Sequence, residues 1–310
     1  MTTLGSDPLQ GGTSTEGDPV ESLLEVLSLA STEARTTEDI FTGISLPMPY
    51  GRVYGGQVLA QAVVAASRTM DADRPIHSMH GYFLRAGDSS KGITFSVDRL
   101  RDGRSFSARR TQAFQEGVPI FSMIASFQTE DDGLEHVIPA PDVPGPDEIS
   151  SPEGTGVHPM SRRRFGDLPI EVRHVDGSLY GADPVAPQPR QAVWVRSRRE
   201  MPDDPLLHRA ALAYLSDMTI QESILRAHGL TWMTPGGTVA SLDHAMWWHR
   251  PVRVDDWLLY VQESPTSRGG RGLATGRIYT RDGDLVASVA QEVMVRAPKE
   301  ILEERARAEG

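Results

Sequence analysis

Residues 97–107 of this chain read Val-Asp-Arg-Leu-Arg-Asp-Gly-Arg-Ser-Phe-Ser, and they open a pattern that the chain repeats. An apolar segment, Gly-Val-Pro-Ile-Phe-Ser, follows at 117–122. Further along, Gly-Gly-Arg-Gly at 269–272 is followed by Gly-Asp-Leu-Val-Ala-Ser at 283–288. Because the serines that end the two apolar segments lie 166 residues apart, and similar glycine-containing turns precede them, we infer a tandem duplication.

A second pair of similar segments lies upstream of the first. Residues 78–85 read Ser-Met-His-Gly-Tyr-Phe-Leu-Arg, and residues 242–250 read Leu-Asp-His-Ala-Met-Trp-Trp-His-Arg. We match their histidines, His80 and His244, which lie 164 residues apart. A polar side chain that is present in only one copy then indicates where chemistry should be sought.

Size and composition limit the class of protein. The 310 residues are about twice a typical domain, so two units are expected. The hydrophobic fraction of 39% is ordinary for a globular protein, and no apolar run is long enough to cross a bilayer. A net charge of −11 argues against a nucleic-acid partner, and the absence of cysteine excludes disulfides and thiolate metal sites. Residues 1–18 lack the features of an export signal, so we expect a disordered leader and a cytoplasmic protein.

Helical and β patterns follow one another in the same order in both halves. The first half is expected to contain helices at 20–29 and 57–70 and a meander of strands at 76–85, 93–100, 104–115 and 118–129. The second half is expected to contain a helix at 204–227 and strands at 238–250, 257–264, 271–281 and 284–296. This order predicts an α+β fold in which each repeat wraps an antiparallel sheet around a central helix.

The boundaries of the repeats follow from composition. Prolines are frequent among the acidic and glycine residues of 138–156, which is typical of a linker. We therefore predict an N-terminal repeat at 19–130, a Pro-rich linker at 131–165, a C-terminal repeat at 166–298 and a charged tail at 299–310.

Asp217 is unusual for its position in the second long helix. It lies more than three turns beyond the expected start, where a carboxylate gains nothing from the N-terminal dipole and where helix interiors disfavour aspartate. Matching the helices of the two halves places Asp217 opposite Val63, an ordinary core position. Asp217 could therefore hold a water molecule as a general base, and the alternative is an exposed aspartate on the helix surface.

Gln291 poses the same question in a strand. In the register of the matched serines it lies opposite Ala125, and it shares a strand face with Ala287, Val289 and Val293. An inward glutamine must find hydrogen-bond partners, because leaving its amide unpaired costs about 1–3 kcal/mol. It either orients a water molecule or is a satisfied structural residue.

Ser241 begins the strand that follows the second helix. With Asp217 and Gln291 it would supply a hydroxyl, a carboxylate and an amide around one water molecule, although alone it is an ordinary polar strand-end residue. Metal chemistry is not expected, because Asp243, His244 and His249 do not all lie on one face of the strand. No cofactor is expected either.

Gly55 and Gly56 open the first long helix. The pair lacks the context of a phosphate-binding loop. Exposed amides at a helix N-terminus can polarise a carbonyl oxygen, and glycines there also allow close helix packing. The two interpretations, polarisation of a carbonyl oxygen and close helix packing, do not exclude each other.

At this point the sequence resembles the type II acyl-CoA thioesterases, which have a tandem, or double, hotdog fold. The resemblance rests on four stretches, and it extends from about Glu21 to Arg296. These stretches are Tyr-Gly-Gly-Gln-Val at 54–58, His-Ser-Met-His-Gly-Tyr-Phe-Leu-Arg at 77–85, residues 101–110, and Leu-Asp-His-Ala-Met-Trp-Trp-His-Arg-Pro at 242–251.

The resemblance implies hydrolysis of fatty acyl-CoA by a directly attacking water, without a covalent intermediate or a metal. It assigns the water to Asp217, Ser241 and Gln291, and the thioester oxyanion to amides near Gly56 and Gln57. The family usually has threonine where this chain has Ser241, which retains the hydroxyl and lacks the methyl group. Acyl-CoA is the implied partner, and a homo-oligomer, a dimer or tetramer, could form through exposed sheet edges.

Two other functions remain open. Hydratases of the same fold use a motif of the form D-x-N-P-x-H, and residues 203–208 (Asp-Asp-Pro-Leu-Leu-His) resemble it only loosely. We interpret them as a helix cap. A non-catalytic acyl-CoA-binding protein is the other alternative, and the retention of Asp217 and Gln291 argues against it.

Overall fold

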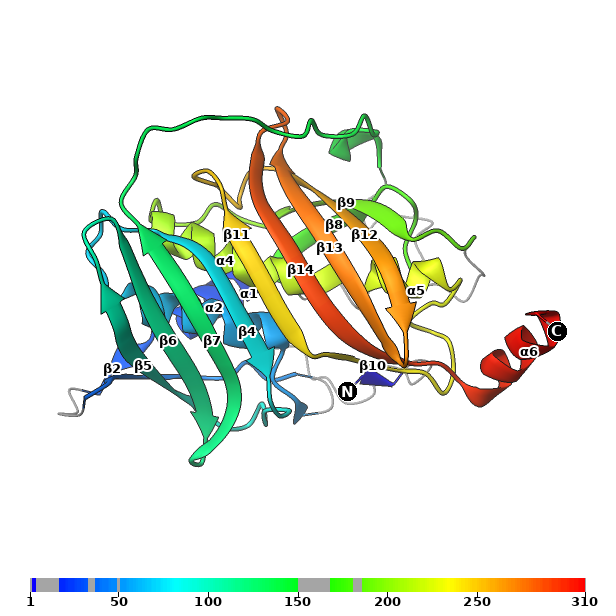
Figure 1. Ribbon diagram of the computed structural model, residues 1–310, viewed down its shortest axis with the longest axis horizontal. Helices are drawn as coiled ribbons and strands as arrows, with labels where there is room; N and C mark the ends of the chain where they lie inside the picture. The colour runs from blue at the N-terminus through cyan, green and yellow to red at the C-terminus, as the bar shows by residue number, and fades with distance from the viewer. Residues whose placement is uncertain are drawn as a thin grey trace.

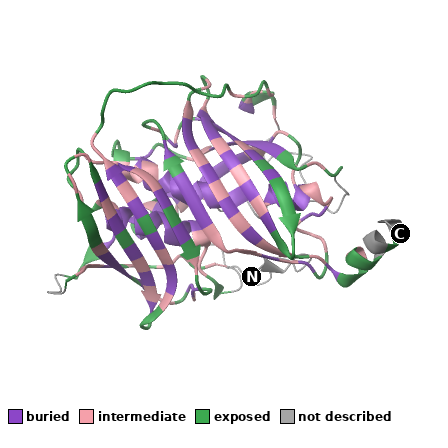
Figure 2. Cartoon of the chain, viewed as in Figure 1, coloured by how far each residue is buried: buried purple, intermediate pink, exposed green. Residues whose placement is uncertain are grey.

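The computed structural model describes residues 2–3, 17–32, 37–48, 51–149, 168–180 and 186–309 of the chain. Its strands form a fourteen-stranded sheet, and helices pack against one face of that sheet (Figure 1). Along the strands, buried residues alternate with more exposed ones, as expected when one face covers a core (Figure 2).

The N-terminal half contains the helices and strands that the sequence pattern predicts. Its elements are α1 Pro19–Leu27, β2 Ala30–Ser31, β3 Asp39–Gly43, α2 Gly55–Ser67, β4 Ile76–Phe83, β5 Ile93–Asp102, β6 Phe106–Gln115 and β7 Val118–Gln128. The strands lie in the order β2-β3-β5-β6-β7-β4. The expected meander is therefore wrong at β4, which pairs with β7 rather than β5. At this inner position β4 can pair with strands of both halves.

The C-terminal half has a similar order. Its elements are β8 Ile170–His174, β9 Arg190–Ser197, α4 Pro205–Thr219, α5 Glu222–Ala227, β10 Thr238–Ser241, β11 Asp243–Trp248, β12 Leu258–Arg268, β13 Arg271–Thr280 and β14 Leu285–Arg296. The linker before it contains η2 Pro146–Glu148, and the tail after it contains α6 Lys299–Glu309. The strands lie in the order β11-β14-β13-β12-β9-β8, and β10 pairs with the other end of β14.

The two halves share one sheet and one core. Strands β4 and β11 pair antiparallel, with Met79 opposite Met246, so the sheet continues from one half into the other. Behind it, α2 and α4 pack against each other, and a single buried apolar cluster includes residues of both helices. This arrangement confirms the predicted α+β fold, a tandem hotdog.

The pairing of the strands corrects one match between the repeats. Tyr82 pairs with Ser122, and Trp247 pairs with Ser288, so Trp247 is the counterpart of Tyr82. This places Ala245, and not His244, at the position that corresponds to His80. The match of the two histidines is wrong by one residue, and such a shift reverses the face to which a side chain points. His80 is accordingly exposed, whereas His244 is fully buried.

The predicted helix at 204–227 is two helices. Helix α4 ends at Thr219, and α5 begins at Glu222. The buried Glu222 carboxylate accepts hydrogen bonds from Gln191 and Trp232, at 3.0 and 3.2 Å, and lies 2.8 Å from His174 Nε2. These partners on neighbouring segments fix α5 as a helix separate from α4. The amphipathic spacing of the sequence alone could not indicate this break.

The ends of the chain and the linker are described in part. Within the predicted leader, Thr2–Thr3 form strand β1, which pairs with β10, so the expected disorder is wrong for these two residues because they find main-chain partners. Residues 4–16 lie outside the described residues, as do 150–165 of the linker and 166–167 of the predicted C-terminal repeat. The described part of the linker packs on the sheet, where the Trp194 indole N–H donates to the Pro144 carbonyl at 2.9 Å.

Helix α2 is buried on nearly all sides, because most of its residues are small and apolar. Gly56 allows the closest approach, since a Cβ there would lie 2.4 Å from the Tyr214 carbonyl oxygen of α4. The Tyr54 hydroxyl donates to the same carbonyl at 2.9 Å. The predicted close packing at these glycines is therefore confirmed, and it brings the start of α2 beside the end of α4.

Candidate active site

Asp217 lies near the C-terminal end of α4, and its side chain is buried. One of its carboxylate oxygens, Oδ1, accepts a hydrogen bond of 2.9 Å from Gln291 Nε2. The Ser241 hydroxyl lies 3.5 Å from the same oxygen. The alternative of an exposed helix-surface aspartate is thereby excluded.

Gln291 and Ser241 complete the group. Gln291 Nε2 also donates to Ser241 Oγ at 2.6 Å. Gln291 lies in β14 and is fully buried, and Ser241 ends β10, the strand that pairs with the distal part of β14. The structure thus brings together three side chains that are up to 74 residues apart in the sequence.

Burial controls the protonation of this group. It raises the pKa of Asp217 to about 6 from its ordinary value of 3.8, although hydrogen bonds from Gln291, the Gly56 main-chain N–H and Ser241 oppose the rise. A carboxylate with a pKa of about 6 is ionised at neutral pH and is more basic than an exposed aspartate. Asp217 therefore combines charge, basicity and a fixed orientation.

Two family models match the chain. The acyl-CoA thioesterase model matches residues 164–294, and the acyl-CoA thioesterase N-terminal domain model matches residues 44–128. Human acyl-coenzyme A thioesterase 8 is 35% identical, covering 95% of this chain and 96% of its own length. Acyl-CoA thioesterase 2 of Haemophilus influenzae is 34% identical, covering 90% and 98%. The crystal structure of acyl-CoA thioesterase II TesB2 from Mycobacterium marinum is 40% identical, with a TM-score of 0.73, and covers 89% of this chain and 98% of its own.

The chain belongs to the type II acyl-CoA thioesterase family.

In this thioesterase, the two other predicted site residues lie at the start of α2. The Gly56 main-chain N–H donates to the Asp217 carboxylate. The N-terminus of α2 therefore points toward the trio formed by Asp217, Ser241 and Gln291. The Gln57 main-chain N–H donates to the Tyr54 carbonyl at 3.1 Å. The buried Gln57 side chain accepts from Leu46 N–H at 3.0 Å and donates to the Ile44 carbonyl at 3.2 Å. Gly56 therefore contacts the trio directly, whereas these contacts of Gln57 are all with main-chain groups of nearby residues.

Two further residues of the thioesterase contact Asp217, Ser241 or Gln291, and a third, Ser216, contacts one of these two. Gln221 Nε2 donates to Ser241 Oγ at 3.0 Å from the turn between α4 and α5. His244 Nδ1 lies 2.9 Å from Gln291 Oε1, and its Nε2 lies 3.0 Å from Ser216 Oγ. The sequence pattern used His244 to match the repeats and weighed it as a metal ligand, but it gave the residue no place in the site. The alternation of β11, which places His244 on the face of Met246 and Trp248, could have indicated that it is buried.

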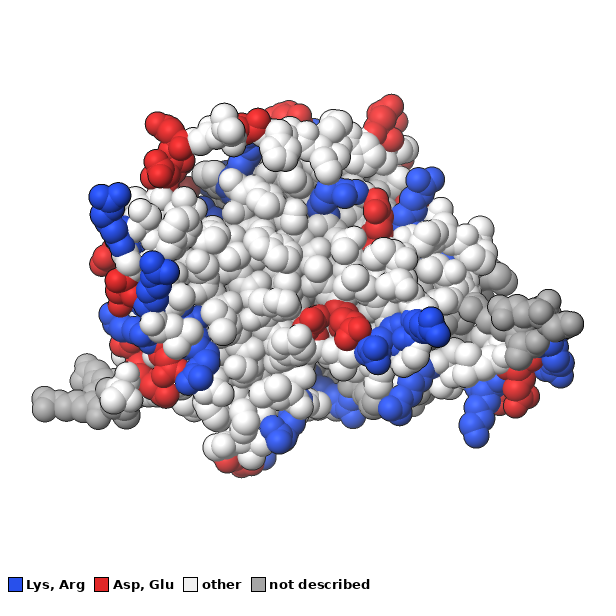
Figure 3. Space-filling view, in the orientation of Figure 1, with Lys and Arg blue, Asp and Glu red and all other residues white. Residues whose placement is uncertain are grey.

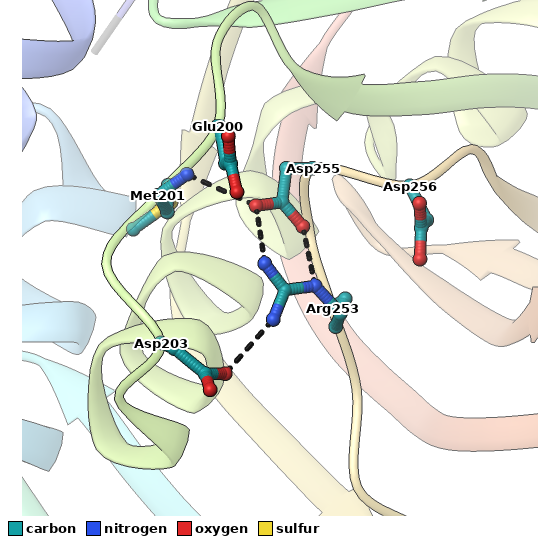
Figure 4. A pocket seen from close by; sticks show the side chains of 6 residues that line it. All are labelled: Glu200, Met201, Asp203, Arg253, Asp255 and Asp256. Atoms are coloured by element: carbon teal, nitrogen blue, oxygen red, sulfur yellow. Dashed lines mark hydrogen bonds and ion pairs between the residues drawn. The ribbon is translucent and has the colours of Figure 1, made fainter.

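A pocket of about 480 Å³ lies beyond the opposite end of α4 (Figure 4). It is lined by Glu200, Met201, Asp203, Arg253, Asp255 and Asp256, and Arg253 bridges Asp203 and Asp255. Asp204 beside it caps α4 by accepting from the Leu206 N–H at 2.8 Å, which confirms the predicted cap. About 20 Å of helix separates this cap from Asp217. The pocket is acidic, so it does not suit the phosphates of coenzyme A.

Proposed function

We propose that this thioesterase hydrolyses fatty acyl-CoA by direct attack of a water molecule that Asp217, Ser241 and Gln291 hold. The observation that supports the proposal is the convergence of the three side chains, with Gln291 Nε2 donating to both Asp217 and Ser241. Thioester hydrolysis itself follows from family membership over nearly the whole chain.

The chemistry needs no stronger nucleophile than water. Asp217 takes a proton as the water oxygen attacks the thioester carbonyl carbon. The C–S bond then breaks, and coenzyme A leaves as a thiolate that takes up a proton. In this scheme, neither an acyl-enzyme nor a metal takes part. Within the described ranges, no three His, Asp or Glu side chains lie together as metal ligands would.

The N-terminus of α2 is the proposed oxyanion site. Main-chain N–H groups and the helix dipole at this terminus favour the negative charge that develops on the carbonyl oxygen. The Gly56 N–H supports this assignment more strongly than the Gln57 N–H because it lies beside Asp217. Both groups already have an acceptor, Asp217 for Gly56 and the Tyr54 carbonyl for Gln57, so each would have to share its proton with the oxyanion. The acyl chain is proposed to lie between the two repeats.

The hydratase alternative receives no support from the geometry. Asp203, which stands at the motif's aspartate position, pairs with Arg253 at 2.9 Å, and His208 Nδ1 accepts from the Val254 N–H at 3.2 Å. Both residues of the loosely matching motif are therefore engaged in the local structure.

Thiol release from a series of acyl-CoAs by purified protein tests the function. We expect D217N to lower kcat by about 10²–10⁴-fold, because it removes the general base. The matched control is D203N, since the Asp203 side chain lies just before α4, is 94% exposed and should leave kcat unchanged. The proposal is wrong if folded D217N hydrolyses acyl-CoA at the normal rate, or if the protein adds water to an enoyl-CoA and releases no thiol.

The location and the assembly of the protein are predicted from its sequence. Among the described residues, no helix is both long enough and apolar enough to span a membrane. A cytoplasmic location, a role in fatty acid metabolism and a homo-oligomer are proposed on the grounds of sequence. The view of the outer face of the sheet, which carries few charged side chains over its middle, supports self-association (Figure 3).

A further inference from the structure

His244 is a buried titratable residue for which the proposed reaction has no use. It is fully buried in β11, and both of its ring nitrogens lie at hydrogen-bond distance from a partner. One partner is Gln291, the amide that contacts both Asp217 and Ser241. A histidine in such a place acts on the reaction only through Gln291.

Hydrogen-bond directions around Gln291 fix the state of the histidine. An ionised Asp217 can only accept, so the amide nitrogen of Gln291 must face it. The amide oxygen then faces His244 Nδ1 at 2.9 Å, and Nδ1 must carry a proton. Burial lowers the pKa of His244 to about 4, so the ring is neutral at pH 7 and its Nε2 carries no proton. Nε2 lies 3.0 Å from the Ser216 hydroxyl, whose one proton can go to Nε2 or to the Ala213 carbonyl at 2.9 Å. Nδ1 remains a donor even in the charged ring.

We infer that His244 is a positioning residue, resting on the proposed function, whose Nδ1–H holds the Gln291 amide in the one orientation that serves Asp217 and Ser241. An amide is nearly symmetric in shape, so packing alone does not distinguish its oxygen from its nitrogen. Without the donor, the amide can turn and present its oxygen to the carboxylate. Two acceptors would then face each other, and the water site would lose its geometry.

The consequence for Asp217 has a definite sign. The hydrogen bond from Gln291 lowers the pKa of Asp217, so its loss raises that pKa above about 6. The other groups that face the carboxylate are the Gly56 N–H, Ser241 and Tyr260, a phenol whose own pKa is raised by burial and by Asp217. None of them is charged at neutral pH, so they leave the direction of this shift unchanged.

The test compares two variants with different donors. H244L removes the donor, and H244N places an amide N–H near the position of Nδ1. H249L is the matched control, because His249 follows the same strand and is exposed. For H244L we expect kcat to fall by roughly 100-fold with little change in KM, and the acidic limb of kcat/KM to move upward by about one pH unit. H244N should have a kcat at least about tenfold higher than that of H244L, and the acidic limb of its kcat/KM should return to about pH 6.

The outcomes separate this inference from the proposed function. Near-normal kcat and an unmoved acidic limb in folded H244L, beside an inactive D217N, would overturn the role of His244 alone. Activity in D217N would overturn the proposed function. If H244L does not fold, H244N is compared with H244Q, whose amide lies nearer the position of Nε2. Equal activities of these two would contradict the role, and an advantage of Asn by about tenfold or more would support it.

Discussion

At the scale of residues, Asp217 is a carboxylate that the fold holds at a cost in stability. Burial raises its pKa to about 6, whereas the unfolded chain has the ordinary value of 3.8. The folded state therefore binds the proton more tightly than the unfolded state does. The stability that this proton contributes is present below about pH 3.8, and it is lost as the pH rises through about 6.

This cost predicts a pH-dependent difference between the native protein and D217N, whose amide does not titrate. Between pH 4 and pH 8, the native protein should lose on the order of 1–3 kcal/mol of unfolding free energy relative to D217N. Urea unfolding of both proteins across this range measures the difference. A constant difference would show that Asp217 has an ordinary pKa.

The sequence indicated some of these residues and not others. Asp217 and Gln291 could be predicted because each is polar where the matched position of the other repeat, Val63 or Ala125, is apolar, and the structure places both inside. His244 was missed because its importance depends on a partner in another strand. Gln221 was missed because the break between α4 and α5, where it lies, has no helix-breaking residue.

At the scale of elements, the contact of α2 with α4 positions the site. Gly56 lets the first turn of α2 approach the last turns of α4, and its N–H reaches Asp217. Any side chain at this position would push the two helices apart, because the nearest atom is a main-chain oxygen that cannot move alone.

We therefore predict that G56A destabilises the protein by about 1–3 kcal/mol and lowers kcat. A Cβ there would meet the Tyr214 carbonyl at 2.4 Å and the Tyr54 ring at 2.5 Å. G133A is the matched control, because a Cβ at Gly133 has no neighbour within 4 Å and should change stability by less than about 0.5 kcal/mol. Chemical unfolding of the two variants checks this, and equal stabilities would contradict the role of the contact.

Strands were easier to predict from the sequence than their order. Alternation and turn residues located β5, β6 and β7 to within a few residues, because these signals are local. The place of β4 between β7 and β11 depends on both halves of the chain, so local patterns could not reveal it.

At the scale of the whole molecule, one active site is assembled from two unequal copies. The C-terminal repeat supplies Asp217, Ser241 and Gln291, and the N-terminal repeat supplies Gly56. In the N-terminal copy, the strand positions that match His244 and Gln291 are occupied by Met79 and Ala125, which pair with each other and are buried. Its counterpart of the site is therefore apolar, and we expect one site in each chain.

The duplication was visible in the sequence, but its register was only partly so. The serine match agrees with the burial patterns of β7 and β14, and the strand pairing then shows that the histidine match differs by one residue. Identical residue types in two copies are weak guides to register, because two histidines can be matched one position out of register. Such a shift reverses the face of every side chain in the strand.

The central claim is that Asp217 activates water and does not itself attack the thioester. A rapid-quench experiment on the first turnover, with enzyme in excess over a fatty acyl-CoA, tests it most directly. Direct attack predicts that coenzyme A and free fatty acid appear together at every time point, with no acyl group on the quenched protein. Coenzyme A that appears ahead of the fatty acid, with an acyl adduct on the peptide that carries Asp217, would contradict the account.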